Sequence, residues 1–228
     1  MRNKILVAVA LLSGLYLIRN LYYILLVLPD EAAQGAIYRI LYFHLPGWIT
    51  SFTAYFCAAL ASIWYLVKRD QRADEFAVAF TEVGVIFTML GLATGMVWAR
   101  IIWGVWWVWD PRLTWAFVCW LTYMGYLMLR GTIDEPGQRA RIASVVSLFA
   151  FVSVVITYKS IDWWRTQHPG AVLSFRTGEQ RIDPAMENML FHNMVALVAF
   201  AGVLMMLRLG QERMQRELDA LRRQAHSL

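Results

Sequence analysis

Residues 76–97 read FAVAFTEVGVIFTMLGLATGMV, a run of 22 residues that carries a single charged side chain, Glu82. A helix of about 20 apolar residues crosses the roughly 30 Å hydrocarbon core of a bilayer, because it rises about 1.5 Å per residue. The sequence therefore predicts an all-α integral membrane protein, with a six-transmembrane-helix bundle in residues 1–207. The other five apolar stretches are 5–28, 46–67, 113–129, 142–158 and 189–207.

The composition of the chain excludes several classes of protein. Of its 228 residues 59% are apolar and 16% are charged, whereas an ordinary soluble domain has about 25% charged residues. The segments between the apolar stretches are too short for a soluble nucleotide-binding or catalytic domain, and no Gly-x-x-x-x-Gly-Lys phosphate loop is present. We therefore expect a protein that is not an enzyme. The two cysteines, Cys57 and Cys119, lie in different apolar stretches and predict neither a redox pair nor a thiolate metal site.

The basic residues predict how the chain lies in the membrane. The N-terminus and the segments 68–72, 130–141 and 208–228 together carry 13 lysines and arginines, against seven in the three other connections. Because cytoplasmic segments are enriched in lysine and arginine, we expect both termini in the cytoplasm. The net charge of +5 follows from this distribution, which forms no basic patch for a nucleic acid. The outer loops are then 29–45, 98–112 and 159–188.

Local signals refine this topology. The pair Leu45-Pro46 is predicted to open the second span, which places His44 in the loop at its outer lip. Asp110-Pro111 is predicted to open the fourth span, with Asp110 as the N-cap and proline at the first helical position. Residues 208–228 are predicted to form a cytoplasmic helical tail, either a solvated extension of the last span or a docking surface for a partner.

The tryptophans are concentrated on the predicted outer side. Nine of the eleven lie in or beside the outer loops, whereas interfacial belts would place them at both membrane surfaces. Four lie within residues 103–110, which we name the tryptophan segment. Such a cluster suits a large, flat, apolar ligand such as a porphyrin or a quinone ring. The four are Trp103, Trp106, Trp107 and Trp109, and a further outer pair is Trp163 and Trp164.

Two histidines, His44 and His168, fall in the predicted outer loops beside aromatic residues. Haem iron has two axial positions that neutral imidazoles fill well, so this pair is the candidate ligand set. His192, within the last span, is predicted to be a hydrogen-bonded core residue. Outer arginines, with Arg39 and Arg112 as candidates, are suited to the haem propionates because the guanidinium binds carboxylates.

Three segments carry a family resemblance that extends over nearly the whole chain. Residues 103–114, WGVWWVWDPRLT, resemble the tryptophan-rich "WWD" signature of the haem-handling proteins of cytochrome c maturation. Residues 38–46, YRILYFHLP, and 163–168, WWRTQH, resemble the two outer histidine segments of that superfamily. Six spans with two outer histidines are similar to its small member, the haem exporter protein C (CcmC) type.

The resemblance implies that haem b is held at the periplasmic face of the bacterial inner membrane, between His44 and His168 and over the tryptophan segment, with Asp110 in the haem-binding set. It also implies delivery of haem to a periplasmic haem chaperone. The implied partners are the ATPase and membrane subunits of an ABC-type transporter, where ATP is hydrolysed, and a small single-span subunit.

The sequence leaves two alternatives to haem handling. A multi-span solute transporter needs paired charges or broken helices near the membrane midplane, but Arg19 and Glu82, the charged residues within the spans, are predicted to lie too far apart to meet. A membrane b-type electron-transfer protein holds its haem between histidines on facing helices, whereas the candidate histidines here are predicted in loops. Both alternatives are therefore less favoured.

Overall fold

The computed structural model describes residues 2–170 and 183–226, and these residues form six α-helices. The predicted all-α fold with six helices is confirmed. A short π-helix, η1 (Tyr23–Val27), follows α1, and a short 3-10 helix, η2 (Ala36–Ile40), precedes α2. The six helices are α1 (Arg2–Tyr22), α2 (Leu41–Lys68), α3 (Gln71–Ile102), α4 (Pro111–Gly131), α5 (Pro136–Trp163) and α6 (Pro184–His226).

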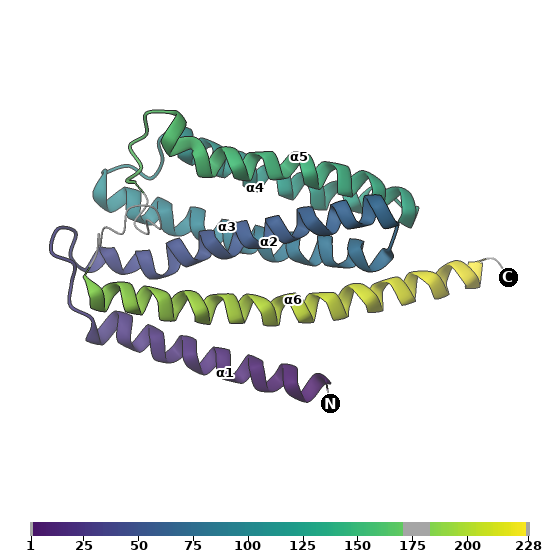
Figure 1. Cartoon of the computed structure of the whole chain (residues 1–228), viewed down its shortest axis with the longest axis horizontal. Helices are drawn as coiled ribbons and strands as arrows, with labels where there is room; N and C mark the ends of the chain where they lie inside the picture. Colours follow the sequence, from purple (N-terminus) through teal and green to yellow (C-terminus); the bar gives the residue numbers. More distant parts are fainter. Residues whose placement is uncertain (1, 171–182, 227–228) are drawn as a thin grey trace.

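The helices run side by side along one long axis (Figure 1). Helices α2 to α5 form the closely packed part of the bundle, α6 lies against α2 and α3, and α1 lies against α6. Alanines and serines are frequent where these helices meet, which lets their backbones approach closely. One end of the bundle carries residues 23–44, 98–112 and 158–170, and we name it the histidine end. Both chain termini lie toward the other end.

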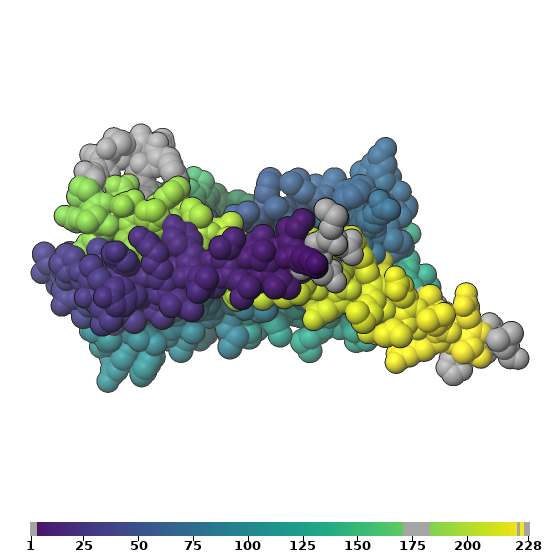
Figure 2. Space-filling model, turned by 90° about the horizontal axis from the view of Figure 1, so that it is seen from below, coloured from purple at the N-terminus to yellow at the C-terminus, as the bar shows by residue number. Residues whose placement is uncertain are grey.

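The surface of the bundle fits a multi-pass membrane protein. Five of the six helices, all except α4, are long and apolar enough to cross a membrane. Many large apolar side chains lie exposed along the outside, and the most apolar window of α1 is only 11% buried. Figure 2 shows α1 running along the outer face of the molecule. In lipid such side chains are in their preferred solvent, so their exposure is expected.

The helices extend beyond the predicted spans, and the largest correction concerns α2. This helix begins at Leu41, so Pro46 does not open it, and His44 lies in its first turn rather than in a loop. Proline lacks the N–H that would bond to the carbonyl oxygen four residues earlier, in Tyr42. Asn193 of α6 donates to that oxygen from its side chain at 2.5 Å. This buried contact explains how the helix continues through Pro46.

Other helix boundaries also differ from the predicted spans. Helix α3 continues to Ile102 and α5 to Trp163, and α6 begins at Pro184, so the connections at the histidine end are shorter than predicted. The predicted cap of α4 is confirmed, because the Asp110 carboxylate accepts from the backbone N–H of Arg112 and Pro111 is the first helical residue.

The predicted helical tail is a direct continuation of α6. Its first turns pack on α3 through ion pairs, which join Arg208 to Glu82 and Arg213 to Glu75. Glu82 is therefore paired within the bundle, and Arg19 lies over the ring of Tyr23, 4.6 Å from its centroid. A solute pathway would need Arg19 and Glu82 to pair with each other, but each of them has another partner.

Candidate functional site

His44 lies in a close contact between α2 and α3 that depends on glycine. A methyl group at Gly95 would lie 3.0 Å from the His44 Cε1 atom, and one at Gly91 would lie 2.7 Å from the Trp48 indole. The two glycines are one helical turn apart and face α2, so α3 can lie directly against both rings. The absence of side chains at these positions fixes where His44 sits.

Hydrogen bonding favours one tautomer of His44. Its Nδ1 atom lies 3.0 Å from the Thr94 hydroxyl, and that hydroxyl donates its single hydrogen to the Leu90 carbonyl at 2.7 Å. With its hydrogen on that carbonyl, Thr94 accepts from His44, which favours the tautomer with the proton on Nδ1 and the lone pair on Nε2. The indoles of Trp48 and Trp98 contact the imidazole edge-on, with centroid distances of 6.3 and 5.8 Å, and hold the ring from two sides.

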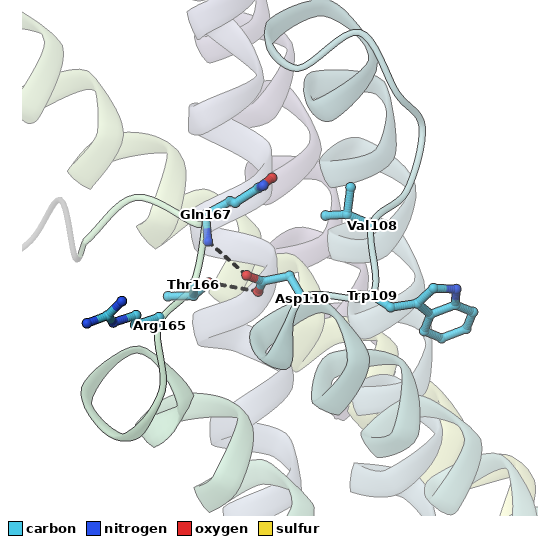
Figure 3. A pocket seen from close by; sticks show the side chains of 6 residues that line it. All are labelled: Val108, Trp109, Asp110, Arg165, Thr166 and Gln167. Carbon is cyan, nitrogen blue, oxygen red and sulfur yellow. Dashed lines mark hydrogen bonds between the residues drawn. The ribbon is translucent and has the colours of Figure 1, made fainter.

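His168 lies in the segment that follows α5, and Asp110 holds this segment in place. The Asp110 carboxylate accepts from the Thr166 hydroxyl at 2.7 Å and from the Gln167 backbone N–H at 2.8 Å (Figure 3). The Thr166 oxygen in turn accepts from the His168 backbone N–H at 3.0 Å. The N-terminus of α4 and the segment that carries His168 are thus tied together by one carboxylate.

The His168 ring is arranged like that of His44. Its Nδ1 atom lies 2.8 Å from the Pro169 carbonyl oxygen, which can only accept, so Nδ1 donates and Nε2 is left unprotonated. Burial, followed by the positive charge of Arg112, lowers the pKa of His168 from its ordinary 6.5 to about 4, although the Pro169 carbonyl and the Asp110 carboxylate act in the opposite direction. His168 and Arg112 are also near enough for their charges to act on His44. The fold therefore places the two predicted histidines at the same end of the bundle.

The tryptophans separate into exposed and packed groups. Trp107 is half-buried and contacts the rings of Trp109 and Phe117, with centroid distances of 5.8 and 6.0 Å. Trp103 is half-buried at the end of α3, and Gly104 follows with a φ of 77°, a left-handed conformation that favours glycine. Of the six predicted tryptophans, two are thus packed and the other four form an exposed apolar surface. The exposed members are Trp106, Trp109, Trp163 and Trp164.

A polar pocket of about 430 Å³ lies between the tryptophan segment and the segment before His168. It is open to the surface, and its lining combines the buried Asp110 carboxylate with the side chain of Arg165. In Figure 3 Trp109 points away from Asp110 on the far side of this pocket. The complete lining is Val108, Trp109, Asp110, Arg165, Thr166 and Gln167.

The two predicted arginines have structural partners. All three guanidinium nitrogens of Arg39 are engaged, with the carbonyls of Ile24 and Leu28 at 2.7 and 2.9 Å and with Asp30 at 2.5 Å. Arg39 thus fastens the end of η1, and its role toward a propionate stays a prediction. Arg112 donates from Nη1 to the Thr157 carbonyl at 3.0 Å, and its charge still acts on both histidines.

Sequence reasoning missed the residues that orient the histidines. Thr94, Thr166 and Gln167 are ordinary polar residues in the sequence, and their importance depends on contacts over 50 or more positions. The glycines of α3 offered a readable signal, since Gly91 and Gly95 share one helix face. His192, predicted to be a hydrogen-bonded core residue, bonds through Nδ1 to the Tyr16 hydroxyl at 2.5 Å.

Comparisons with known proteins agree with this architecture. A family model described as heme exporter protein C matches residues 1–224. The heme exporter protein C of Bradyrhizobium diazoefficiens is 35% identical over 202 residues, which cover 88% of this chain and 73% of that protein. The protein of the same name from Escherichia coli K12 is 33% identical over 181 residues, covering 79% and 72%. That of Paracoccus denitrificans is 29% identical over 194 residues, covering 85% and 80%.

Proposed function

Since the chain belongs to the heme exporter protein C family, we propose that it binds haem b at the histidine end of the bundle and delivers it during cytochrome c maturation. His44 and His168 supply the two axial imidazoles. The observation that carries this proposal is the matched placement of the two rings: in each, Nδ1 lies within hydrogen-bond distance of an oxygen, so that Nε2 can keep its lone pair. Ligand histidines are commonly fixed through the second nitrogen in this way.

The surroundings of the two rings support haem as the cargo. Exposed indoles at Trp106, Trp163 and Trp164 offer apolar faces for a porphyrin edge. Arg112 and Arg165 lie at the same end, and guanidinium groups pair with carboxylates such as the haem propionates. A charge on Arg112 also keeps a nearby imidazole neutral, which is the state that binds iron.

The function of the protein is to hold and transfer haem, not to catalyse a reaction. In this proposal the exposed tryptophans present the bound haem to a periplasmic haem chaperone. The ATPase and membrane subunits of an ABC-type transporter and a small single-span subunit complete the complex, and ATP hydrolysis takes place in the ATPase. The histidine end then faces the periplasm, as the 13 basic residues on the opposite side favour.

The test is a visible spectrum of the purified protein before and after haem is added. Two axial imidazoles give a six-coordinate, low-spin spectrum, and either His44→Ala or His168→Ala should abolish it. His192→Ala is the matched control, because the His192 ring already bonds to Tyr16 and should not bind iron. A wild-type spectrum that does not change on addition of haem, or loss of the signal in His192→Ala alone, would contradict the proposal.

A further inference from the structure

A second pocket lies on the opposite face of α3 from His44. It has a volume of about 350 Å³ and opens between α3 and α4, below the tryptophan segment. Helix α3 contributes four of its lining residues, while Trp107, Trp109, Phe117 and Trp120 contribute aromatic rings. The pocket is lined only by apolar residues. The residues from α3 are Met89, Leu92, Ala93 and Met96.

The position of this pocket indicates contact with lipid. Its α3 residues lie within the membrane-spanning part of that helix, in the half that ends at the histidine end. Met89 and Met96 are among the exposed large apolar residues, so this wall of the pocket faces outward from the bundle. The surface that the pocket presents at this depth is apolar and is suited to hydrocarbon, while the indole N–H groups of Trp107 and Trp120 are buried behind it without a partner among the described residues.

A cation lies one turn above the pocket. Residues 89, 93, 96 and 100 are spaced by four, three and four positions, so they share one face of α3. Arg100 therefore sits roughly 6 Å nearer the histidine end than Met96, at 1.5 Å per residue. It is exposed, it donates from Nη1 to the Gly104 carbonyl, and it forms no ion pair within the described ranges 2–170 and 183–226. Its remaining donors are available to an anion at the membrane surface.

We propose that this pocket binds one acyl chain of an anionic phospholipid, with the lipid phosphate on Arg100. The cavity admits on the order of ten methylene groups, if each takes about the 30 Å³ of a water molecule. Bound there, the chain covers Trp109, whose side chain is 74% exposed, and packs under Trp107. The lipid thus supports the tryptophan segment from below, on the side away from the iron ligands.

The test counts bound lipid by native mass spectrometry, after the full-length protein is purified in mild detergent and given phosphatidylglycerol or phosphatidylcholine. Wild-type protein should retain one phosphatidylglycerol in preference to phosphatidylcholine. Arg100→Gln should weaken phosphatidylglycerol binding about tenfold, since a charge-assisted bond is lost. Ala93→Trp should fill the cavity and weaken retention of both lipids. Arg100→Gln changes an exposed side chain. It therefore tests the site even if Ala93→Trp disturbs folding.

Two control variants separate this site from general attraction of lipid. Arg72→Gln removes an exposed arginine at the opposite end of α3, and Val152→Trp adds an indole to the exposed surface of α5; both should keep the wild-type lipid count. Equal retention by wild type, Arg100→Gln and Ala93→Trp would overturn the proposal. So would the finding that haem, recognised by its mass and absorption, occupies the pocket in place of phospholipid. Because lipid is counted directly, the result is independent of haem binding at the histidines.

Discussion

The Asp110 carboxylate accepts a 2.7 Å hydrogen bond from the Thr166 hydroxyl, which links two segments 56 residues apart. The same carboxylate caps α4 through the Arg112 N–H and accepts from the Gln167 N–H. An aspartate that the sequence identifies as a helix cap therefore also holds the segment that carries His168. Asp110 therefore connects the tryptophan segment to the segment that carries His168 through hydrogen bonds.

Separate substitutions distinguish the two roles of Asp110. Thr166→Val should leave the α4 cap intact but release His168, whose backbone N–H bonds to the Thr166 hydroxyl. We expect the six-coordinate haem spectrum to be weakened while the free energy of unfolding falls by about 1 to 3 kcal/mol, because the hydroxyl makes two hydrogen bonds, to Asp110 and from His168, of about 0.5 to 1.5 kcal/mol each. Asp110→Ala loses the cap as well, which costs about 0.5 to 2 kcal/mol more. Haem titration and chemical denaturation in detergent measure the two effects.

Asp110→Asn is the informative intermediate. One oxygen survives to cap α4 and accept from Thr166, but the amide NH₂ then faces the Gln167 N–H, a donor against a donor. We expect near-normal stability with weakened axial ligation. Normal ligation in both Asp110→Asn and Thr166→Val would show that the His168 segment is held by other contacts.

Gly95→Ala tests whether the close approach of α3 positions the first histidine. The added methyl group would lie 3.0 Å from the His44 Cε1 atom, so the ring must shift by a few tenths of an ångström, partly off its rotamer. Such a displacement costs about 0.5 to 1.5 kcal/mol, or roughly two- to tenfold in haem affinity. Gly125→Ala on α4 is the control, because a methyl group there meets nothing within 4 Å. Equal haem affinity in the two variants would remove Gly95 from the site.

The sequence predicted the outline of this molecule better than its contacts. Apolar runs gave six helices because lipid imposes a minimum length on each span, and Asp110-Pro111 marked the start of α4 correctly. The start of α2 was wrong, since the Asn193 amide that satisfies the Tyr42 carbonyl comes from 151 residues away. The contacts through which Thr94 and Thr166 orient the histidines could not be predicted from the sequence either, because they join residues 50 and 56 positions apart. Residue type and the family resemblance identify the two histidines in the sequence, whereas the oxygen that lies beside each Nδ1 atom is evident only in the fold.

The lowered pKa of His168 predicts an acid-resistant ligand. With a pKa of about 4, in place of the ordinary 6.5, the ring stays neutral as the pH falls from 7 to 5, and protonation competes with iron only near pH 4 and below. The His44→Ala variant isolates this residue, because His168 is then the remaining histidine of the proposed pair. We expect its haem absorption to be constant between pH 7 and 5 and to decline toward pH 4. A midpoint near 6.5 would mean that burial and Arg112 do not keep the ring neutral.

Trp106 provides the clearest test of the proposed transfer surface. Its side chain is 54% exposed at the histidine end, whereas Trp107 packs on Trp109 and Phe117. An exposed indole at the same end of the bundle as the two histidines is suited to contact with a partner protein, in which tryptophan often supplies 2 kcal/mol or more of the binding free energy. Trp106→Ala should therefore reduce capture of the haem chaperone by roughly thirtyfold and leave the low-spin haem spectrum unchanged. Co-purification of the chaperone with the haem-loaded protein measures this loss.

The control for Trp106→Ala is Trp64→Ala, which removes an indole of similar exposure, 41%, from the half of α2 away from the histidines. General loss of an aromatic anchor would affect membrane insertion in both variants, since exposed tryptophans also hold proteins at the bilayer surface. Specific loss of chaperone capture in Trp106→Ala assigns the indole to transfer. If both variants capture the chaperone normally, Trp106 is an interfacial anchor, and contact with the chaperone must involve other exposed residues at the histidine end, with Trp163 the next to test.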